Sequence, residues 1–433
     1  MRKQAIAFAF MLAIVAFAAL GVRYFGMVFT TSTRWAFLAF LIAVLIPGGQ
    51  IFSGLKNGYG IILAGYFIWC LMTAVWSEVP TLSLLKSTAL MLTALALLSG
   101  GTYWATRFPD KTLAFLAPIT GLALIAALGG SASQVVNANY SVYSGLTNNS
   151  NFFGMLVAFS FPYVIYQVYQ IIRAPRSRAK SILVAAACAI LCFALWRSGS
   201  RASMLCVLLT IFVPVAAVSP NKKIVVILAL VVGTLGATVV VPQIEEKFVE
   251  HVVLKSNEEG DVFYSRYAPW KQSYAAALQG GYFGLGYGVS AGNTDFTIGL
   301  TADTYGREKG NAQLAVWEET GLVGLALYSI LLFAIFKELY RAFRAARDDD
   351  AKTKLAIILG MTAGLTAQSV FEAWWVAPGS LESAAFWSVV GVGTGLSRQV
   401  LAGHRRVAVN AVRANRGEAA VALLHGKRFR PLK

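Results

Sequence analysis

The stretch "GNAQLAVWEETGLVG", Gly310–Gly324, joins a polar Gly-Asn pair to the start of a long apolar segment. Two adjacent glutamates, Glu318 and Glu319, lie inside this otherwise apolar run. A carboxylate that faces lipid without a partner is costly. We therefore expect both glutamates to lie beside a polar cavity or to pair with an arginine. The polar start predicts the point at which the chain enters a membrane span.

The composition of the whole chain indicates a membrane protein. Of the 433 residues, 57% are hydrophobic and only 13% are charged, whereas a soluble domain is about half apolar and about a quarter charged. The apolar excess has to be buried in lipid, so the net charge of +17 does not indicate nucleic acid as a partner. The four cysteines lie in apolar runs, and the three histidines form no cluster with them. We therefore expect no disulfide, no metal site and no cofactor.

Apolar segments long enough to cross a bilayer, about 20 residues each, recur along the chain. They predict an all-α integral membrane protein with about twelve transmembrane helices. The first segment resembles a signal peptide, but so many spans follow it that we interpret it as a retained anchor. The expected spans are 5–22, 34–52, 59–76, 82–99, 112–130, 152–172, 181–196, 203–219, 223–241, 313–336, 353–373 and 381–399.

The distribution of lysine and arginine predicts the orientation of these spans. With a cytoplasmic N-terminus, most of the 37 Lys and Arg residues fall in cytoplasmic loops, and both termini then face the cytoplasm. The chain divides into spans over 1–241, one large outer loop over 242–311, further spans over 312–400 and a basic cytoplasmic tail over 401–433. The loop separates spans nine and ten. We expect the tail to lie on anionic membrane lipid.

The outer loop contains one segment that is typical of an amphipathic helix, "SRYAPWKQSYAAALQG". Ser265 is placed to cap this helix, Arg266 then occupies its first position, and Pro269 falls in its first turn. The glycines of "GYFGLGYG", 281–288, resemble a nucleotide-binding fingerprint only superficially, because no strand-turn-helix unit surrounds them. We predict that they form a tight turn that leads the chain back to the membrane.

Few basic residues face outward, and three arginines among them allow two interpretations. Arg197 and Arg201 lie in "WRSGSRASML", a turn of five residues between two spans, and Arg266 opens the loop helix. They either snorkel to the interface or support a close-packed turn. Alternatively, their guanidinium groups bind an anion beside the free N–H groups of a helix start. A lipid-linked pyrophosphate at the outer membrane surface fits that second interpretation.

Aromatic residues surround Arg266 in the sequence. Tyr267 and Trp270 lie close to it, with Tyr264 and Tyr274 on either side. Such a cluster is typical of the aromatic belt at a membrane interface. It is also suited to stacking against sugar rings or against an isoprenoid chain, and both readings stay open.

Several short motifs, taken in order, resemble the O-antigen ligase and O-antigen polymerase superfamily. They cover most of the chain, and all of them fall on the outer side of the expected topology. The similar stretches are "WSEVPTLSLLKS" (Trp76–Ser87), "GLTNNSNFFG" (Gly145–Gly154), "SGSRAS" (Ser198–Ser203), "SRYAPWKQS" (Ser265–Ser273) and "GYFGLGYG" (Gly281–Gly288).

The opening stretch is similar to a ligase pattern within this superfamily. That pattern has His, then Asn, Ser or Gln, then nine residues, then Gly-x-x-Gly. Here Asn311 is followed by nine residues and by Gly321 and Gly324, but Gly310 stands where the pattern has histidine. Glu319 also fits the pattern. The resemblance thus implies catalytic roles for Asn311 and Glu319.

The resemblance implies a glycosyltransferase architecture of the GT-C type in a bacterial inner membrane. It further implies metal-independent, inverting transfer of a glycan from undecaprenyl pyrophosphate to an acceptor hydroxyl. In this reading Arg197, Arg201 and Arg266 bind the pyrophosphate, because charge grows on the leaving group. Trp270, Tyr267 and Asn151 contact glycan or lipid.

The proton acceptor is the open point of this reading, because Gly310 cannot take a proton. Glu308, Lys309 and His251 lie in the same loop, and Glu308 is the closest carboxylate in sequence. We expect Glu308 to act as the base. Alternatively, the acceptor hydroxyl loses its proton late, to water or to the leaving phosphate.

Polymerisation of exopolysaccharide or O-antigen repeat units is the function that the sequence favours. A ligase that attaches glycan to a lipid A-core acceptor is the nearest alternative, and a transporter of lipid-linked sugar or of polysaccharide is the alternative from a different class. A non-catalytic assembly partner is the third. The expected partners are the lipid-linked oligosaccharide, a glycan or lipid A-core acceptor, membrane lipids, and flippase and chain-length regulator proteins.

Overall fold

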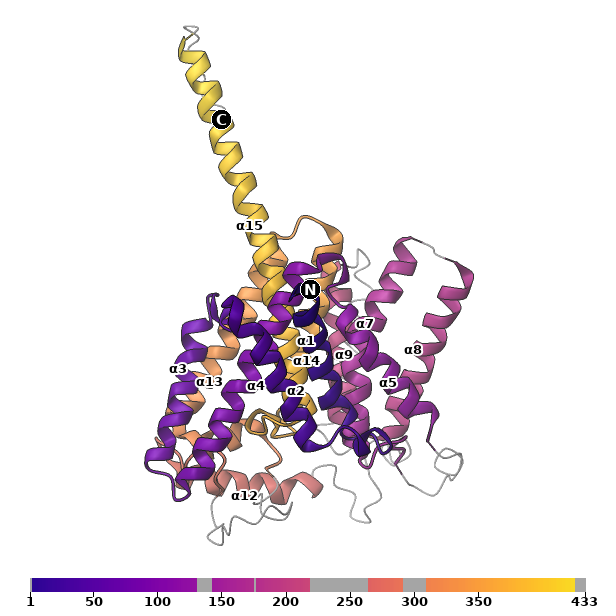
Figure 1. The fold of residues 1–433 in the computed structure, drawn as a ribbon, viewed down its shortest axis with the longest axis vertical. Coiled ribbons are helices and arrows are strands. Elements are labelled where there is room, and N and C mark those ends of the chain that lie inside the picture. Colours follow the sequence, from indigo (N-terminus) through magenta and orange to yellow (C-terminus); the bar gives the residue numbers. More distant parts are fainter. Residues whose placement is uncertain (1, 131–141, 175–176, 219–263, 291–308, 425–433) are drawn as a thin grey trace.

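The computed structural model describes residues 2–130, 142–174, 177–218, 264–290 and 309–424. Within them, 2–3, 264–269 and 404–424 are described by backbone alone. The described elements are helical (Figure 1). The α-helices are α1 (Arg2–Ala19), α2 (Thr31–Leu45), α3 (Gly60–Met72), α4 (Pro80–Arg107), α5 (Ala117–Leu128), α7 (Ser150–Arg173), α8 (Arg178–Ser198), α9 (Arg201–Val218), α12 (Tyr264–Gly280), α13 (Ala312–Ala345), α14 (Asp349–Gln368) and α15 (Leu381–Leu424).

Short 3-10 helices connect or extend several of these elements. They are η1 (Phe25–Met27), η2 (Ile46–Gly48), η3 (Ser53–Leu55), η4 (Thr73–Val75), η5 (Pro109–Lys111), η6 (Ala114–Leu116) and η8 (Trp374–Val376).

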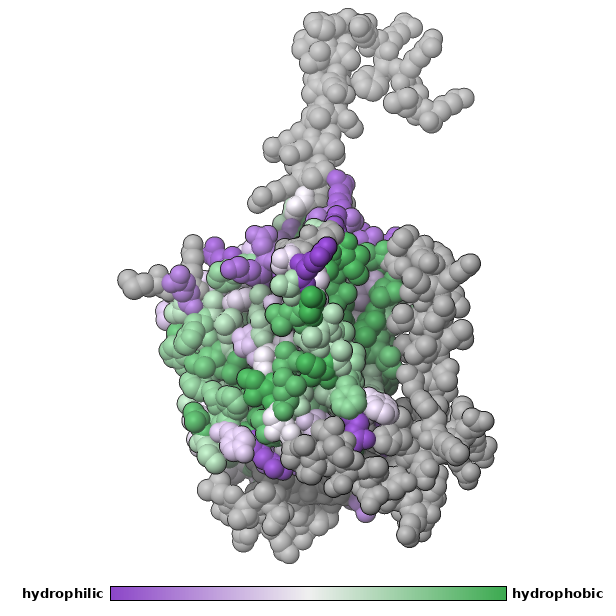
Figure 2. Space-filling view, turned by 90° about the vertical axis from the view of Figure 1, so that its right-hand side faces the viewer, coloured by the Kyte–Doolittle hydropathy of each residue, from purple (hydrophilic) through white to green (hydrophobic). Residues whose placement is uncertain are grey.

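Six of the described helices are long and apolar enough to cross a membrane, and the protein is an all-α membrane protein. The six segments are Thr31–Gly48, Pro80–Arg107, Ser150–Arg173, Arg178–Ser198, Arg201–Val218 and Ala312–Ala345. Figure 2 shows apolar side chains over the middle of the bundle and polar side chains at the end from which α15 projects. The six coincide with six of the twelve expected spans.

The other six expected spans fall into three groups when they are compared with the structure. Three correspond to shorter apolar helices, Gln4–Ala19, Gly60–Val75 and Ala114–Leu128. Two correspond to α14 and α15, which are not among the six long apolar segments. The ninth, 223–241, lies outside the described residues. The count of twelve spans stays a prediction.

The centre of the bundle is packed through small residues. Helices α4 and α15 approach so closely that a Cβ on Gly101 would lie 2.8 Å from the carbonyl oxygen of Ser388. A Cβ on Gly391 would lie 2.4 Å from the carbonyl oxygen of Leu98. Thr102 Oγ1 donates to the Gly391 carbonyl at 3.1 Å across the same contact. Small residues let helix backbones meet in a membrane, where apolar burial between helices supplies little driving force.

The loop helix α12 lies crosswise over one end of the bundle (Figure 1). The N-terminus and the projecting half of α15 lie at the opposite end. This arrangement agrees with a loop on one side of the membrane and both termini on the other. Which compartment each side faces stays a prediction.

Candidate functional site

Helix α13 is interrupted at Gly321, and a segment between α12 and α13 closes the interruption. Gly321 has φ 70° and ψ −176°, which is not helical. We call the segment Gly281–Ser290 the glycine loop. Its amides at Leu285 and Gly286 donate to the carbonyls of Glu318 and Glu319, at 2.9 and 3.0 Å.

The other side of the interruption is paired in the same way. The amides of Leu322 and Val323 donate to the carbonyls of Gly281 and Tyr282, at 3.1 and 3.2 Å. Between them, the Thr320 carbonyl accepts the indole N–H of Trp69 at 2.8 Å. Irregular backbone at membrane depth is tolerated only when its polar groups are satisfied. Here the protein itself satisfies them.

The glycines of this loop are required by its geometry. Gly284, Gly286 and Gly288 have φ values of 83°, 113° and 80°. A Cβ on Gly284 would lie 2.4 Å from the carbonyl oxygen of Glu319, and one on Gly286 would lie 2.2 Å from Ser77 Oγ. L-residues with side chains rarely adopt such φ values. The predicted tight turn is therefore confirmed.

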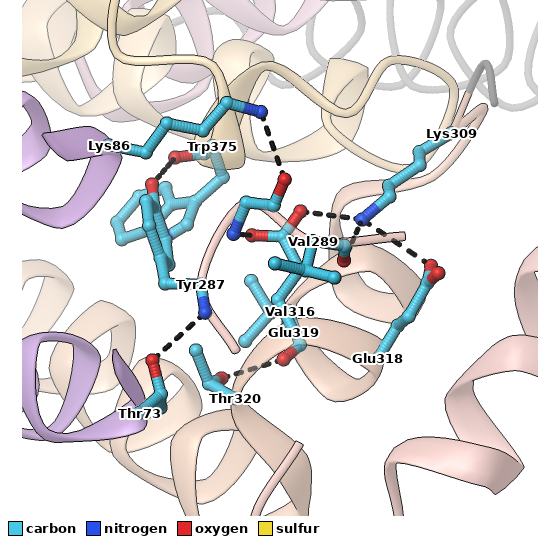
Figure 3. A network of polar contacts seen from close by, with 11 residues as sticks. Thr73, Lys86, Tyr287, Val289, Lys309, Val316, Glu318, Glu319, Thr320 and Trp375 are labelled. Atoms are coloured by element: carbon cyan, nitrogen blue, oxygen red, sulfur yellow. Dashed lines mark hydrogen bonds and ion pairs between the residues drawn. The ribbon is translucent and has the colours of Figure 1, made fainter. Parts of the chain in front are cut away.

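The two glutamates of the opening stretch pair with a lysine, which the sequence did not identify as their partner. Lys309 Nζ lies 2.6 Å from Glu319 Oε1 and 3.5 Å from Glu318 Oε2 (Figure 3). The Lys309 side chain is only 8% exposed, and those of Glu318 and Glu319 are 0% and 2% exposed. A lysine just ahead of the span therefore offsets the cost of two buried carboxylates.

Glu319 also holds the glycine loop in place. Its Oε2 accepts the amide of Gly288 at 2.6 Å, and Lys309 Nζ donates to the carbonyl of Val289 at 3.2 Å. From the other side, Lys86 Nζ donates to the Gly288 carbonyl at 3.1 Å (Figure 3). These contacts join α4, α13 and the loop into one polar network.

Tyr287 anchors the middle of the glycine loop in the core. Its amide donates to Thr73 Oγ1 at 2.9 Å, and its hydroxyl donates to the Trp375 carbonyl at 3.5 Å. Burial raises the pKa of the Tyr287 phenol well above its usual value. The phenol therefore stays protonated and acts as a hydrogen-bond donor.

Three of the predicted site residues meet at one segment, Ser369–Glu372, which we call the α14 corner. The Trp270 ring of α12 packs on Phe371 with centroids 6.1 Å apart. Asn311 Nδ2 donates to the Val370 carbonyl at 3.0 Å. Asn151 Nδ2 donates to Glu372 Oε1 at 3.4 Å. Residues from α7, α12 and the start of α13, far apart in sequence, thus converge on this corner.

Asn311 and Trp270 fix the start of α13. Asn311 is the N-cap, and its Oδ1 accepts the Leu314 amide at 2.9 Å. Trp270 Nε1 donates to the Gly310 carbonyl at 2.9 Å. A side chain at N-cap satisfies an amide that has no partner within the helix. The contacts therefore give both residues a positioning role, and their proposed catalytic or glycan contacts stay predictions.

The arginine turn is tighter than expected. Helix α8 ends at Ser198 and α9 begins at Arg201, so the predicted turn of five residues is reduced to Gly199 and Ser200. Gly199 has φ 60°. Arg197 lies in the last turn of α8 and Arg201 in the first turn of α9. The helices continue further into the motif because small residues let the chain reverse within two positions.

The arginine turn packs against the start of α7. A Cβ on Gly154 would lie 2.6 Å from Ser200 Cβ and 3.0 Å from Ser203 Oγ. Gly154 stands three residues after Asn151, which is about 4.5 Å along a helix axis. The turn that carries Arg201 therefore lies about one helical turn from the residue that contacts the α14 corner.

Two other predicted residues are placed by backbone alone. Arg266 and Tyr267 lie in α12, which already begins at Tyr264. The expectation that Ser265 caps this helix and that Arg266 occupies its first position is therefore wrong. Glu308, the expected base, lies outside the described residues.

Sequence reasoning missed Lys309, Lys86 and the α14 corner as parts of the site. Lys309 was considered only as a replacement base, although it directly precedes Gly310. Glu372 lies in the last residues of an expected span, and a carboxylate there was the available signal. Among the described residues, no group of three or more His, Cys, Asp or Glu side chains is placed to hold a metal ion.

The fold and this site define a class: a multi-helix membrane protein with an interrupted helix, which is closed by a loop next to a helix that lies crosswise over one end of the bundle. A scan against protein-family models finds no match to the chain, and a search of curated proteins finds no relative. The superfamily resemblance therefore rests on the sequence motifs.

Proposed function

We propose that this protein transfers a glycan from undecaprenyl pyrophosphate to an acceptor hydroxyl at the periplasmic face of a bacterial inner membrane. The reaction is polymerisation of exopolysaccharide or O-antigen repeat units. The observation that supports this proposal most is the convergence of Asn151, Trp270 and Asn311 on the α14 corner. The motifs that carry the resemblance are thereby neighbours in space at one end of the bundle.

The proposed reaction is a single displacement. The acceptor oxygen attacks the anomeric carbon, the bond from that carbon to the pyrophosphate oxygen breaks, and the configuration inverts. Negative charge develops on the leaving pyrophosphate, so cations held in place beforehand lower the barrier selectively. Arg201 supplies one such cation from the start of α9. Arg266 supplies another from α12, one turn before Trp270. Arg197 contributes from the adjoining end of α8.

The proton of the acceptor hydroxyl goes to Glu308 or to the leaving pyrophosphate. Glu319 and Lys309 are already engaged with each other and with the glycine loop. In this proposal they position the loop beneath the reacting groups and take no proton. Tyr267, Trp270 and Asn151 border the region that the glycan or the lipid occupies. Flippase and chain-length regulator proteins are the expected assembly partners.

A ligase that uses a lipid A-core acceptor employs the same donor chemistry and stays the nearest alternative. The transporter alternative is less well supported. Transporters expose unwound carbonyls and helix ends to their ions. In α13 the carbonyls of Glu318, Glu319 and Thr320 are occupied by the glycine loop and by Trp69. They leave little at the interruption for an ion to bind.

A deletion strain separates these functions. Complemented with the wild-type gene, it is expected to make long glycan. Without the gene, single repeat units on the outer surface indicate a polymerase, and long chains left on the carrier indicate a ligase. Intermediates held on the cytoplasmic side indicate transport and contradict the proposal.

Arginine variants in the same strain test the proposed cation. Arg201→Ala is expected to lower glycan formation by about 10²-fold or more at an unchanged protein level. Arg201→Lys is expected to restore only part of it, because the bidentate fork is lost. Arg344→Ala, at the other end of the bundle in the last turn of α13, is the matched control. Normal glycan in the Arg201→Ala strain removes Arg201 from the mechanism.

A further inference from the structure

A second polar site lies at the opposite end of the bundle. A cleft of about 380 Å³ opens between η5, α7, the start of α8 and the start of α14. Helix α7 has 24 residues, which corresponds to about 36 Å at 1.5 Å per residue. Asn151 stands at one end of this helix, and Gln170 lines the cleft near the other. The cleft therefore lies at the other membrane surface from the candidate site.

One wall of the cleft is a closed hydrogen-bond network. Asp350 accepts from Tyr166 Oη at 2.8 Å and from Gln170 Nε2 at 3.1 Å. Its second oxygen lies 2.6 Å from Lys354 Nζ, and Lys354 also donates to the Pro109 carbonyl at 3.0 Å. The charge of Asp350 is thus compensated within the protein. These contacts fix this wall of the cleft. The charges that are available to bind a ligand therefore belong to the other residues of the cleft.

The remaining charged residues of the cleft come from two separate elements. Lys111 lies in η5, next to Asp110, and Lys180 lies in the first turn of α8. Within the described part of the chain, the side chains of these three residues have no hydrogen bond or ion pair. Two ammonium groups suit the oxygens of a phosphodiester, and a carboxylate beside them suits a cationic group on the same ligand.

An exposed apolar side chain lies one helical turn from the cleft on α8. Leu183 follows Lys180 by three residues, so the two share a helix face, and Leu183 is 70% exposed. It belongs to a segment that is long and apolar enough to cross the membrane. A ligand with a charged head in the cleft can therefore place hydrocarbon chains along α8.

We propose that the cleft binds the headgroup of a zwitterionic phospholipid of the phosphatidylethanolamine type. Lys111 and Lys180 hold the phosphodiester, Asp110 holds the primary ammonium, and Tyr163 lines the pocket between them. The acyl chains follow Leu183 along α8. The site belongs to the membrane leaflet opposite the proposed glycan chemistry and stands independently of that chemistry.

Lipid retention tests this site directly. The full-length protein is purified in detergent, exchanged into nanodiscs of equal phosphatidylethanolamine and phosphatidylglycerol, extracted again and analysed for bound lipid by native mass spectrometry. Wild-type protein is expected to retain phosphatidylethanolamine in preference to phosphatidylglycerol. The Lys111→Ala/Lys180→Ala variant is expected to retain it about tenfold less, which corresponds to about 1.4 kcal/mol.

Two further variants make the test specific. Asp110→Asn is expected to abolish the preference for phosphatidylethanolamine while phosphatidylglycerol still binds. Lys337→Ala, an exposed lysine near the same end of α13, is expected to leave retention unchanged. Equal retention in wild type and in the double lysine variant overturns the proposal. A wild-type preference for phosphatidylglycerol also overturns it. So does soluble glycerophosphoethanolamine if it displaces the bound phospholipid as well as phosphatidylethanolamine does, because the headgroup without acyl chains is then sufficient for binding.

Discussion

Replacing Lys309 with alanine is expected to lower the free energy of unfolding by about 3–5 kcal/mol, as removal of one partner from a buried ion pair does. The lysine is the partner of two buried carboxylates, Glu318 and Glu319, with Nζ–O distances of 3.5 and 2.6 Å. Without it, the two buried carboxylates lose this cation in a membrane-embedded helix. Thermal unfolding in detergent, followed by intrinsic fluorescence, measures the loss.

A neutral triple variant distinguishes charge from packing. Lys309→Met combined with Glu318→Gln and Glu319→Gln removes all three charges together, and we expect it to recover most of the lost stability. The exposed Lys337→Ala variant is the matched control and should unfold as the wild type does. If the Lys309→Ala variant unfolds at the same temperature as the wild type, the lysine does not stabilise the carboxylates, and this account of the opening stretch is wrong.

Replacing Gly321 with alanine is the second change with a large expected effect. Gly321 has φ 70° and ψ −176°, a region that is essentially restricted to glycine and costs other residues about 1–3 kcal/mol. A Cβ there would also lie 2.1 Å from the carbonyl oxygen of Tyr282. Overpacking of that kind adds about 1–3 kcal/mol. We expect little folded protein to be recovered, measured as the monodisperse fraction in size-exclusion chromatography.

A control glycine should respond in the opposite direction. Gly65 lies inside α3, and a Cβ at that position meets nothing within 4 Å. Gly65→Ala is therefore expected to stabilise the protein by about 0.5–1 kcal/mol, the usual difference between the two residues in a helix. If the Gly321→Ala variant is recovered as folded protein in the same amount as the wild type, α13 can form a continuous helix without a cost in stability. The paired interruption would then not be a constraint on the fold.

The sequence predicted the parts of the fold that depend on local composition. Apolar length located the six long spans, and the spacing of Gly284, Gly286 and Gly288 predicted the tight turn. The polar start at Asn311 was also readable, because asparagine is a favoured N-cap. In each case the signal and the structure it produces lie within the same few residues.

The contacts that assemble the candidate site depend on tertiary structure and were not readable in advance. The interruption of α13 requires a backbone partner that arrives from the glycine loop, and nothing in the Gly321–Gly324 spacing identifies that partner. Glu372 accepts a hydrogen bond from Asn151, which lies on a helix more than two hundred positions earlier in the chain. The sequence left open whether Glu318 and Glu319 lie beside a polar cavity or pair with an arginine, and it did not identify Lys309, the lysine next to Gly310, as their partner.

The most direct test of the proposed glycosyl transfer is reconstitution of the purified protein in proteoliposomes with the lipid-linked repeat unit from the deletion strain. The proposal predicts longer lipid-linked glycan, one undecaprenyl pyrophosphate released for each new linkage, and loss of both products in the Arg201→Ala variant. Movement of the intact lipid-linked unit across the bilayer, with no pyrophosphate carrier released, would contradict it.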